Sequence, residues 1–421
     1  MLYGIAAATT ALLLAAVLAA LLRPPALRLG LVDRRRRQRR VPLSGGVAVV
    51  LTTCLVAGVG DWSGIAPLGP DIGALVLAAA AVAVLGLVAD LWRLRTRLLV
   101  LGTAVAAAFV VPYGDTGAWA GAVAVAWITF VALAFRALDH ADGVAGTVGV
   151  VTAFGVAACA AFEVLDGLAV LLSVLAAALT GFLMHNWPPA RVALGGCGSL
   201  FAGFLLASAA VTARAGYEET VGAGVLFALT AVAGADAVLV VVARRLAGRP
   251  LLRGGPDHLA HRLRRLGITP QGATVLLGAA AFSAVLVGTL VHSGWAGPYA
   301  VWWVAGGVLA AVLGLLRVPA HARAREEKGT AHARAREKGT SRTRAREREA
   351  ARTRTGEEET AHAHARKSPR PQPRRAPLFA PRLFAPRRQS ESAVRLPGSS
   401  DGRHGQRVSS QVSASLRVRN G

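Results

Sequence analysis

Long apolar segments recur over the first three quarters of the chain and alternate with short polar loops. A hydrocarbon core about 30 Å thick needs about 17 to 25 mostly apolar helical residues to cross it, and backbone groups cannot stay unpaired there. The pattern therefore predicts an all-α, polytopic integral membrane protein with about eleven transmembrane helices. They are expected near residues 2–22, 41–60, 72–89, 98–113, 118–135, 143–162, 167–184, 192–213, 220–243, 268–291 and 294–316.

The charges of the loops predict how these helices are oriented, because Arg and Lys are retained on the cytoplasmic side of a membrane. The odd-numbered loops are rich in Arg, with a run at residues 34–37 in the first of them. The even-numbered loops carry Asp and Glu, and Arg214 is their only Arg or Lys. We expect a multi-pass protein of the cell membrane with its N-terminus outside and its C-terminus in the cytoplasm.

The apolar character ends near Pro319, where the near-repeats AHARAREEKGT and AHARAREKGT begin. This composition predicts two parts, a transmembrane transferase-like domain at 1–318 and a disordered, basic, low-complexity cytoplasmic tail at 319–421. Much of the net charge of +24 lies in the loops and the tail. Topology therefore explains the charge without nucleic acid as a partner. The three cysteines share no CxxC spacing and indicate neither a disulfide framework nor a zinc site.

The polar clusters that could carry chemistry lie in the loops that we expect on the cytoplasmic side. Asp90 ends the third predicted helix, and Asp139 and Asp142 lie three residues apart after the fifth. Carboxylate oxygens are the ligands that Mg²⁺ prefers, although each of these residues could also be an ordinary helix-end charge. Asp236 falls inside the ninth predicted helix, where a charge in lipid is costly. We expect its side chain to face the protein interior or a cavity.

The seventh and ninth predicted loops contain groups that suit phosphate binding. The seventh, HNWPPARVALGGCGS, offers an Arg and a Gly-rich turn at a helix start, where backbone amides can hold an anion. Such turns also need Gly for backbone reasons alone. The ninth combines an Asp and two His with many Arg, which suits a pyrophosphate or a nucleotide. The candidate substrate-binding residues of these loops are Arg191, Asp257, His258, His261 and Arg262.

The order and spacing of these segments resemble the polyprenyl-phosphate N-acetylhexosamine-1-phosphate transferases of glycosyltransferase family 4. That family includes phospho-N-acetylmuramoyl-pentapeptide transferase and the undecaprenyl-phosphate N-acetylglucosamine-1-phosphate transferases. The resemblance covers about residues 1–317 and rests on VPLSGGVAVV, LGLVADLWRLRTRL, ALDHADGVAG, HNWPPARVALGGCGSLFAGF and GGPDHLAHRLRRLG. It implies that a polyprenyl phosphate oxygen attacks the β-phosphorus of a UDP-amino sugar and releases UMP, in cell-wall or surface-glycan biosynthesis.

The resemblance also implies roles for individual residues, and it adds Asn186 and Ser199 to the candidate substrate-binding residues. Asp90, Asp139 and Asp142 match catalytic positions of the family, and Asp139 and Asp142 would bind Mg²⁺, with Mn²⁺ as an alternative ion. The implied partners are polyprenyl phosphate, a UDP-amino sugar and the membrane. A homodimer is an option that the sequence leaves open.

Several positions depart from the family's motifs. Ala89 stands where the first member of an Asp pair is expected, and His140 replaces the first Gly of a DGxDG motif. Leu133 and Arg136 replace two Asn residues. Gly196 stands where the family is expected to have a magnesium-binding Asp. Arg136 could supply a fixed positive charge in its place, but a guanidinium does not reproduce the ligand geometry of a metal.

Three functions remain open at this stage. The first is a working but divergent sugar-1-phosphate transferase, which the Asp residues and the histidine loop favour. The second is a catalytically silent relative that binds a lipid phosphate, a nucleotide or a partner, which the three departures at Ala89, Arg136 and Gly196 favour. The third is a transporter, indicated by Asp236 and by Gly-rich breaks. A carrier would need ionisable groups near the bilayer midplane, whereas most of these lie at the predicted membrane edge.

Overall fold

The computed structural model describes residues 2–33, 41–92, 94–248 and 257–318. The chain divides into two units, Met1–Glu326 and Glu327–Gly421, and the second lies wholly outside the described residues. The predictions of a disordered tail at 319–421 and of an Arg-rich segment at 34–37 therefore fall on residues that are not described.

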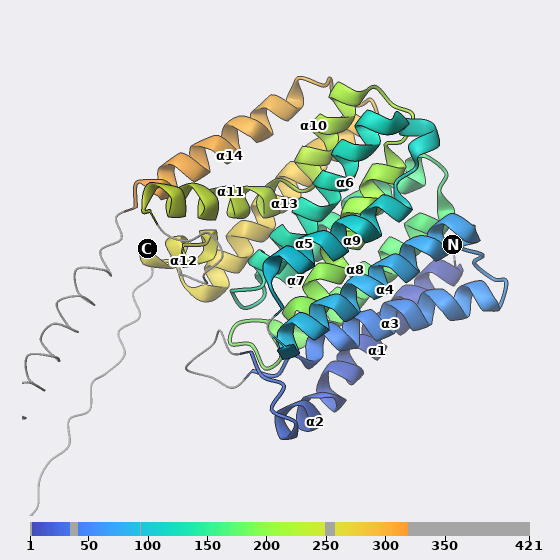
Figure 1. Ribbon diagram of the computed structural model, residues 1–421, viewed down its shortest axis with the longest axis horizontal. Coiled ribbons are helices and arrows are strands. Elements are labelled where there is room, and N and C mark those ends of the chain that lie inside the picture. Colours follow the sequence, from blue (N-terminus) through green and yellow to red (C-terminus); the bar gives the residue numbers. More distant parts are fainter. Residues whose placement is uncertain (1, 34–40, 93, 249–256, 319–421) are drawn as a thin grey trace, which may run out of the picture. The chain divides into compact units, whose positions relative to one another are not determined.

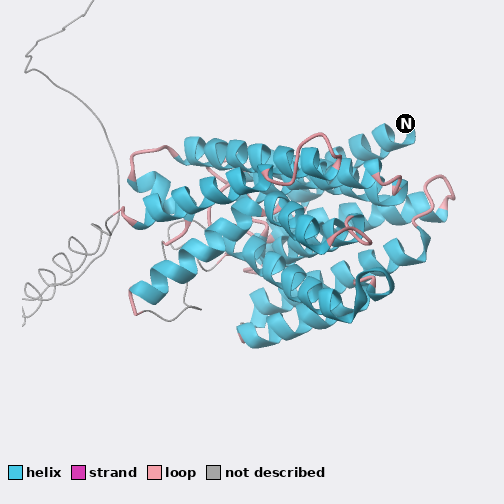
Figure 2. Cartoon of the chain, turned by 90° about the horizontal axis from the view of Figure 1, so that it is seen from above, coloured by secondary structure: helices cyan, strands magenta, loops and turns pink. Residues whose placement is uncertain are grey.

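The regular elements of the described ranges are α-helices, as Figure 2 shows, which confirms the predicted all-α class. Each of the eleven predicted segments coincides with a helix or, for the ninth, with a pair of helices. Two short helices, α2 and α12, lie in predicted loops. In chain order the helices are α1 (Leu2–Leu21), α2 (Arg23–Arg28), α3 (Ser44–Trp62), α4 (Gly69–Trp92), α5 (Thr96–Val110), α6 (Tyr113–Leu138), α7 (Val144–Phe162), α8 (Asp166–Asn186), α9 (Gly195–Ala213), α10 (Glu219–Leu229), α11 (Ala231–Leu246), α12 (Leu259–Arg265), α13 (Pro270–His292) and α14 (Ala300–Leu316).

Eight of these helices are long and apolar enough to cross a membrane, or nine if α10 and α11 form one broken span. A multi-pass membrane protein is thereby confirmed. The ninth predicted segment is not one straight helix, because α10 and α11 meet at Thr230 with a bend of 80°. Helices α5 and α14 have 15 and 17 residues and fall short of a full span. The count of eleven spans and the orientation of the termini stay predictions.

Helix α9 lies at the centre of the packing. Of its apolar stretch, 94% is buried, compared with 33% for α4. It packs against α4, α6, α7 and α3, and α8 packs against α1 and α7 (Figure 1). The α9 sequence GGCGSLFAGFLLASAAVTA is rich in small residues. Small residues let helix backbones approach closely where lipid provides no hydrophobic drive for association.

Two glycines show how close this approach is. A Cβ on Gly46 of α3 would lie 2.0 Å from the Leu194 carbonyl oxygen and 2.5 Å from the Gly198 nitrogen. A Cβ on Gly86 of α4 would lie 2.2 Å from the Gly196 carbonyl oxygen. Backbone atoms of α3 and α4 thus touch the first turn of α9. This turn is therefore held rigidly beside the ends of α4 and α6.

Candidate functional site

The two aspartates that follow α6 bind the backbone of the α8–α9 connection. Asp139 is buried, and its Oδ2 accepts a hydrogen bond of 2.7 Å from the Gly195 N–H. Asp142 Oδ2 accepts a hydrogen bond of 3.0 Å from the Ala190 N–H. Gly143, which follows, is the N-cap residue of α7 and has φ 76°, a backbone conformation that glycine adopts without strain. The α6–α7 loop and the start of α9 therefore form one hydrogen-bonded unit.

Asn186, the last residue of α8, reinforces this unit from a position that is 1% exposed. Its Oδ1 accepts a hydrogen bond of 2.8 Å from the Gly143 N–H, and its Nδ2 donates one of 2.7 Å to the Val192 carbonyl. Both ends of the amide are thus used in joining two loops. A role in substrate binding stays a prediction for this residue.

Asp90, near the end of α4, joins α6 to the first turn of α9. Its Oδ1 lies 3.1 Å from Arg136 Nη2 in an ion pair whose side chains are 12% and 15% exposed, respectively. Its Oδ2 accepts a hydrogen bond from the Gly196 N–H. A Cβ on Gly196 would lie only 1.9 Å from Arg136 Nη1 and 2.7 Å from Asp90 Oδ1. The guanidinium of Arg136 therefore occupies the space that a side chain at position 196 would fill.

This arrangement does not fit a magnesium ion beside Gly196. Mg²⁺ requires a shell of oxygen ligands and is bound through carboxylates. Gly196 offers no carboxylate, the Asp90 carboxylate is paired with Arg136, and the guanidinium places positive charge where the ion would lie. The predicted binding of a metal by Asp139 and Asp142 concerns other atoms and stays a prediction.

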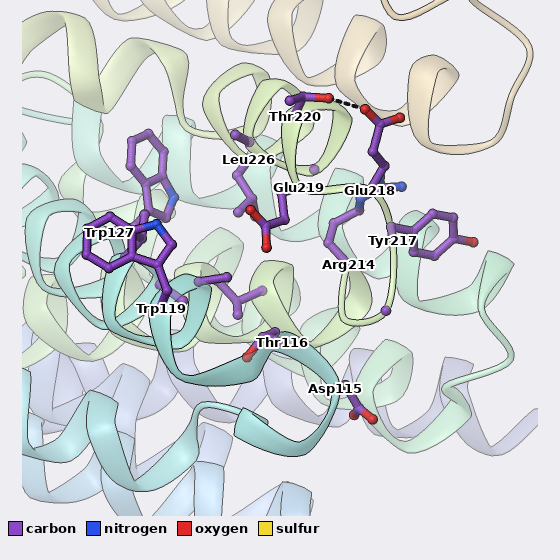
Figure 3. Close-up of a pocket in the computed structure, with 17 residues that line it drawn as sticks. Asp115, Thr116, Trp119, Trp127, Arg214, Tyr217, Glu218, Glu219, Thr220 and Leu226 are labelled. Carbon is purple, nitrogen blue, oxygen red and sulfur yellow. Dashed lines mark hydrogen bonds between the residues drawn. The ribbon is translucent and has the colours of Figure 1, made fainter.

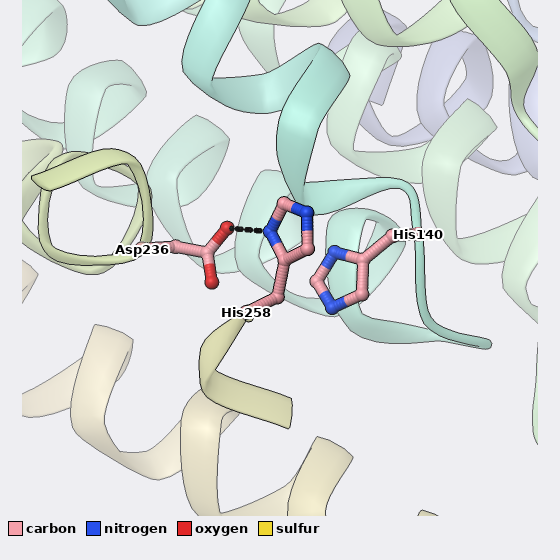
Figure 4. Close-up of side chains that lie close together, drawn as sticks. All are labelled: His140, Asp236 and His258. Atoms are coloured by element: carbon pink, nitrogen blue, oxygen red, sulfur yellow. Dashed lines mark hydrogen bonds and ion pairs between the residues drawn. The ribbon is translucent and has the colours of Figure 1, made fainter. Parts of the chain in front are cut away.

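In the described part of the chain, one group of three His, Cys, Asp or Glu side chains is close enough to share a metal ion. It consists of His140, Asp236 and His258, whose ligand atoms lie within 4.8 Å of one another (Figure 4). Asp236 is fully buried, as expected, and its carboxylate accepts hydrogen bonds of 2.8 Å from His258 Nδ1 and 2.7 Å from the Leu259 N–H. These hydrogen bonds connect α11, through Asp236, to the start of α12.

The geometry of this group favours stacking over metal coordination. The rings of His140 and His258 lie face to face, with centroids 3.7 Å apart and planes at 19°. Their in-plane lone pairs therefore lie in separate, nearly parallel planes, whereas a shared ion would have to lie in both planes at about 2.0–2.1 Å from each nitrogen. The ring of His261 lies beside them, 4.9 Å from the His140 ring.

Burial keeps two of these imidazoles neutral. It lowers the pKa of His140 to about 3, with a further contribution from His258, and it lowers the pKa of His261 to about 4. His140 Nδ1 lies 2.8 Å from the Ala137 carbonyl, which can only accept, so Nδ1 donates and Nε2 carries the lone pair. His140 and His261 are therefore uncharged at neutral pH.

Comparison with known proteins relates this geometry to a family. A family model described as glycosyl transferase family 4 matches residues 72–214, the segment from α4 to the end of α9. A Streptomyces coelicolor protein that carries only a provisional name, as a glycosyltransferase, is 65% identical over 78% of this chain and 81% of its own length. The chain belongs to glycosyl transferase family 4.

More distant family members have more specific names. The decaprenyl-phosphate N-acetylglucosaminephosphotransferase of Mycolicibacterium smegmatis is 28% identical over 48% of this chain and 59% of its own length. A Bacillus subtilis protein, named provisionally as an undecaprenyl-phosphate N-acetylglucosaminyl 1-phosphate transferase, is 25% identical over 60% of this chain and 75% of its own. The family match includes Asp90, Asp139 and Asp142 and stops before the histidine loop.

Two other residues of the seventh predicted loop lie in different surroundings within this family domain. Ser199 is fully buried in α9, and its hydroxyl donates to the Gly195 carbonyl one turn earlier. The Arg191 side chain is exposed, and its backbone N–H donates to the His185 carbonyl at 2.8 Å. Arg191 is thus accessible to a ligand, whereas Ser199 makes a hydrogen bond within its own helix.

Asp257 and Arg262 of the ninth loop connect α12 to its neighbours. Arg262 Nη1 donates a hydrogen bond of 2.6 Å to the Leu315 carbonyl near the end of α14, and its Nε donates to the Asp257 carbonyl at 3.1 Å. The Asp257 carboxylate lies 3.5 Å from Arg244 Nε on α11. These contacts fix the position of α12 and its histidines. The substrate roles predicted for both residues stay predictions.

Sequence reasoning missed two pairings in this family site. It expected Arg136 to supply a fixed positive charge in place of the missing aspartate, but it did not indicate that the guanidinium lies directly over Gly196. It also treated His140 only as a replaced glycine, whereas the ring stacks on His258. The available signal was that Arg136 and His140 each introduce a side chain whose charge or shape requires a partner.

Proposed function

We propose that the chain transfers an N-acetylhexosamine 1-phosphate from a UDP-sugar to a polyprenyl phosphate and releases UMP, in cell-wall or surface-glycan synthesis. The proposal rests on family membership and on one observation. Asp90 and Asp139 come from separate helix ends, and both bind backbone N–H groups of the first turn of α9. A relative named as such a transferase is similar to 48% of this chain.

The reaction joins two anions. A phosphate oxygen of the carrier attacks the β-phosphorus of the UDP-sugar, and the bond from that phosphorus to the oxygen bridging the two phosphates breaks, so that UMP leaves with this oxygen. Positive charge fixed near the phosphates lowers the barrier to this approach. We propose that Arg136 supplies part of that charge, because Asp90 fixes its guanidinium beside the first turn of α9.

A second candidate function is a catalytically silent family member that binds a lipid phosphate. The observation that favours it is the placement of Arg136 over Gly196, where the residues do not fit a magnesium ion. A guanidinium can hold a phosphate by paired hydrogen bonds without any chemistry on it. Both candidates therefore bind a lipid phosphate, but only the first catalyses a reaction on it.

The deciding experiment measures UMP release by membranes that contain the full chain, polyprenyl phosphate and one of several UDP-amino sugars. We expect UMP from the wild type and from Asp71→Asn, a matched control whose side chain is exposed at the first turn of α4. We expect at least a 100-fold loss in Asp139→Asn, of the order found when one electrostatic group of an active site is removed. Absence of UMP with every UDP-sugar would overturn the transferase proposal.

The silent candidate has its own test, which restores aspartates at positions 89 and 196. Because a side chain at 196 meets Arg136 Nη1, the triple variant Ala89→Asp/Arg136→Asn/Gly196→Asp is required. A silent protein should gain magnesium binding, measured by calorimetry, and UMP release. If the wild type already turns over and the triple variant changes neither reading, the silent candidate is wrong.

A further inference from the structure

A separate pocket of about 500 Å³ lies where α9 ends and α10 begins (Figure 3). Its wall is formed by the first part of α6, the α9–α10 connection and α10. Helix α9 has 19 residues and is therefore about 28 Å long at 1.5 Å per residue, close to the thickness of a hydrocarbon core. The pocket, which we call the α9–α10 pocket, is thus one membrane thickness away from the candidate functional site.

Two buried donors in the lining of this pocket have no acceptor within the part of the chain that the structure describes. They are Nε of Arg214 and Nε1 of Trp127. Arg214 is only 7% exposed. Guanidinium and indole N–H groups donate and never accept, so only an acceptor atom from another molecule would satisfy both of them. Buried donors without acceptors are rare in native proteins, and an unseen ligand is one of their explanations.

The charge of Arg214 points to an anionic acceptor. Its Nη1 lies 3.1 Å from His292 Nδ1, and its Cζ lies 4.0 Å from the centre of the Tyr217 ring. Since the guanidinium can only donate, His292 Nδ1 accepts and the imidazole is neutral. The carboxylate of Glu163 reaches the other side of that imidazole, at 3.1 Å from His292 Nε2, and forms no ion pair with Arg214. The buried positive charge is therefore not neutralised by a carboxylate in direct contact.

The rim of the pocket has the opposite charge. Asp115, Glu218 and Glu219 line it and are exposed, and Glu218 accepts a hydrogen bond from the Thr220 hydroxyl. Trp119 stands beside them with 78% of its surface exposed. Carboxylates and an indole face attract an amine cation and disfavour a free anion. The best match is one molecule with a phosphate at the buried end and an ammonium group a few atoms away.

We propose that the α9–α10 pocket binds the head group of an aminophospholipid. Its phosphate would accept hydrogen bonds from Arg214 Nε and Trp127 Nε1, and its ammonium group would lie among the acidic side chains of the rim. The acyl chains would follow the apolar side of the pocket, which Val123 and Leu226 line. Exposed Trp residues at a helix end also suit the membrane interface, where a lipid head group lies.

The test uses the purified full chain in detergent and measures lipid dissociation constants by native mass spectrometry. The probes are phosphatidylethanolamine, phosphatidylglycerol and soluble phosphoethanolamine. We expect phosphatidylethanolamine to bind about tenfold or more tightly than either of the other two. Arg214→Gln and Trp127→Phe should each weaken its binding by about tenfold, the typical effect of losing one hydrogen bond to a charged group.

Two further variants separate the head group from general lipid binding. Trp62→Phe is the matched control, because Trp62 is exposed at the end of α3 and does not line the pocket, and it should bind lipid as the wild type does. Glu218→Gln/Glu219→Gln should weaken phosphatidylethanolamine binding and leave phosphatidylglycerol binding unchanged or tighter. If Arg214→Gln does not fold, Trp127→Phe and the rim variant decide alone. Equal binding of all three probes, or unchanged binding in Trp127→Phe and the rim variant, would overturn the proposal.

Discussion

The contact between Arg136 and Gly196 can be tested by exchanging a single hydrogen atom for a methyl group. In Gly196→Ala the new Cβ would lie 1.9 Å from Arg136 Nη1 and 2.7 Å from Asp90 Oδ1, so the guanidinium would have to move. Neither atom belongs to the backbone, but the two side chains hold each other through the ion pair of 3.1 Å. The substitution therefore strains an electrostatic contact as well as the packing.

The expected change in the free energy of unfolding differs between the wild-type protein and an Arg136→Ala background. Overpacking of this kind typically costs about 1–3 kcal/mol, which we expect for Gly196→Ala in the wild type. In an Arg136→Ala background only the Asp90 carboxylate, 2.7 Å from the new Cβ, has to shift, and alanine within a helix is favoured over glycine by about 0.5–1 kcal/mol. The same methyl group should thus destabilise one protein and leave the other unchanged or slightly more stable. The coupling energy should be about 1.5–4 kcal/mol, at the upper end of what contacting residues show.

The free energies of unfolding of the four proteins in the cycle would be measured in mixed micelles by titration with a denaturing detergent. Arg136→Ala alone should also be destabilising, by about 3 kcal/mol, because it leaves the Asp90 carboxylate without its partner. Equal effects of Gly196→Ala in both backgrounds would mean that the guanidinium does not lie over Gly196. The interpretation of the site as one that does not fit magnesium would then lose its basis.

Three further predictions concern packing, protonation and orientation. Gly46→Ala should destabilise the fold by about 3 kcal/mol or more, since its Cβ would meet backbone atoms, whereas Gly58→Ala on the same helix meets nothing and should be neutral in the same titration. The pKa of His261 is lowered to about 4, so the unfolded chain binds a proton between about pH 6.5 and 4 that the folded chain does not. The contribution of His261 to the free energy of unfolding should be complete above this window and fall as the pH falls through it. In a thermal-shift series, the melting temperature should therefore depend less on pH for His261→Gln than for the wild type. Parallel profiles of the two proteins would contradict this. With the predicted orientation, an impermeant maleimide should label Asp115→Cys on intact cells and Arg95→Cys only after permeabilisation, and the reverse pattern would invert the topology.

The helices could be predicted from the sequence because apolar length alone requires them. Each predicted segment is helical, from 2–22 to 294–316. The bend at Thr230 could not be predicted, because both α10 and α11 are apolar and neither contains proline at the break. Composition indicates where a chain meets lipid, but the direction of a helix axis depends on which neighbours it packs against.

The sequence predicted which loops form the candidate site, but it did not predict which of their side chains contact one another. Sequence order placed Asp90, Asp139 and the histidine loop on one side of the membrane. It could not indicate that Arg136 reaches Asp90, 46 positions away, or that Asp90 binds the Gly196 amide, 106 positions away. Such pairings depend on distances between helices. The glycines that set those distances carry no side chain from which the contact could be inferred.

The burial of α9 has a consequence for how this protein can vary. Side-chain volume limits which residues fit in a helix that other helices surround on nearly every side, such as α9, whereas hydrophobicity limits them in an apolar helix whose side chains are mostly not buried, such as α14. In a saturation-mutagenesis library, Leu, Ile and Phe should therefore be accepted along most of α14 and rejected at the Gly, Ala and Ser positions of α9, where small residues would persist. The two helices should thus tolerate different substitutions, although both belong to the same chain.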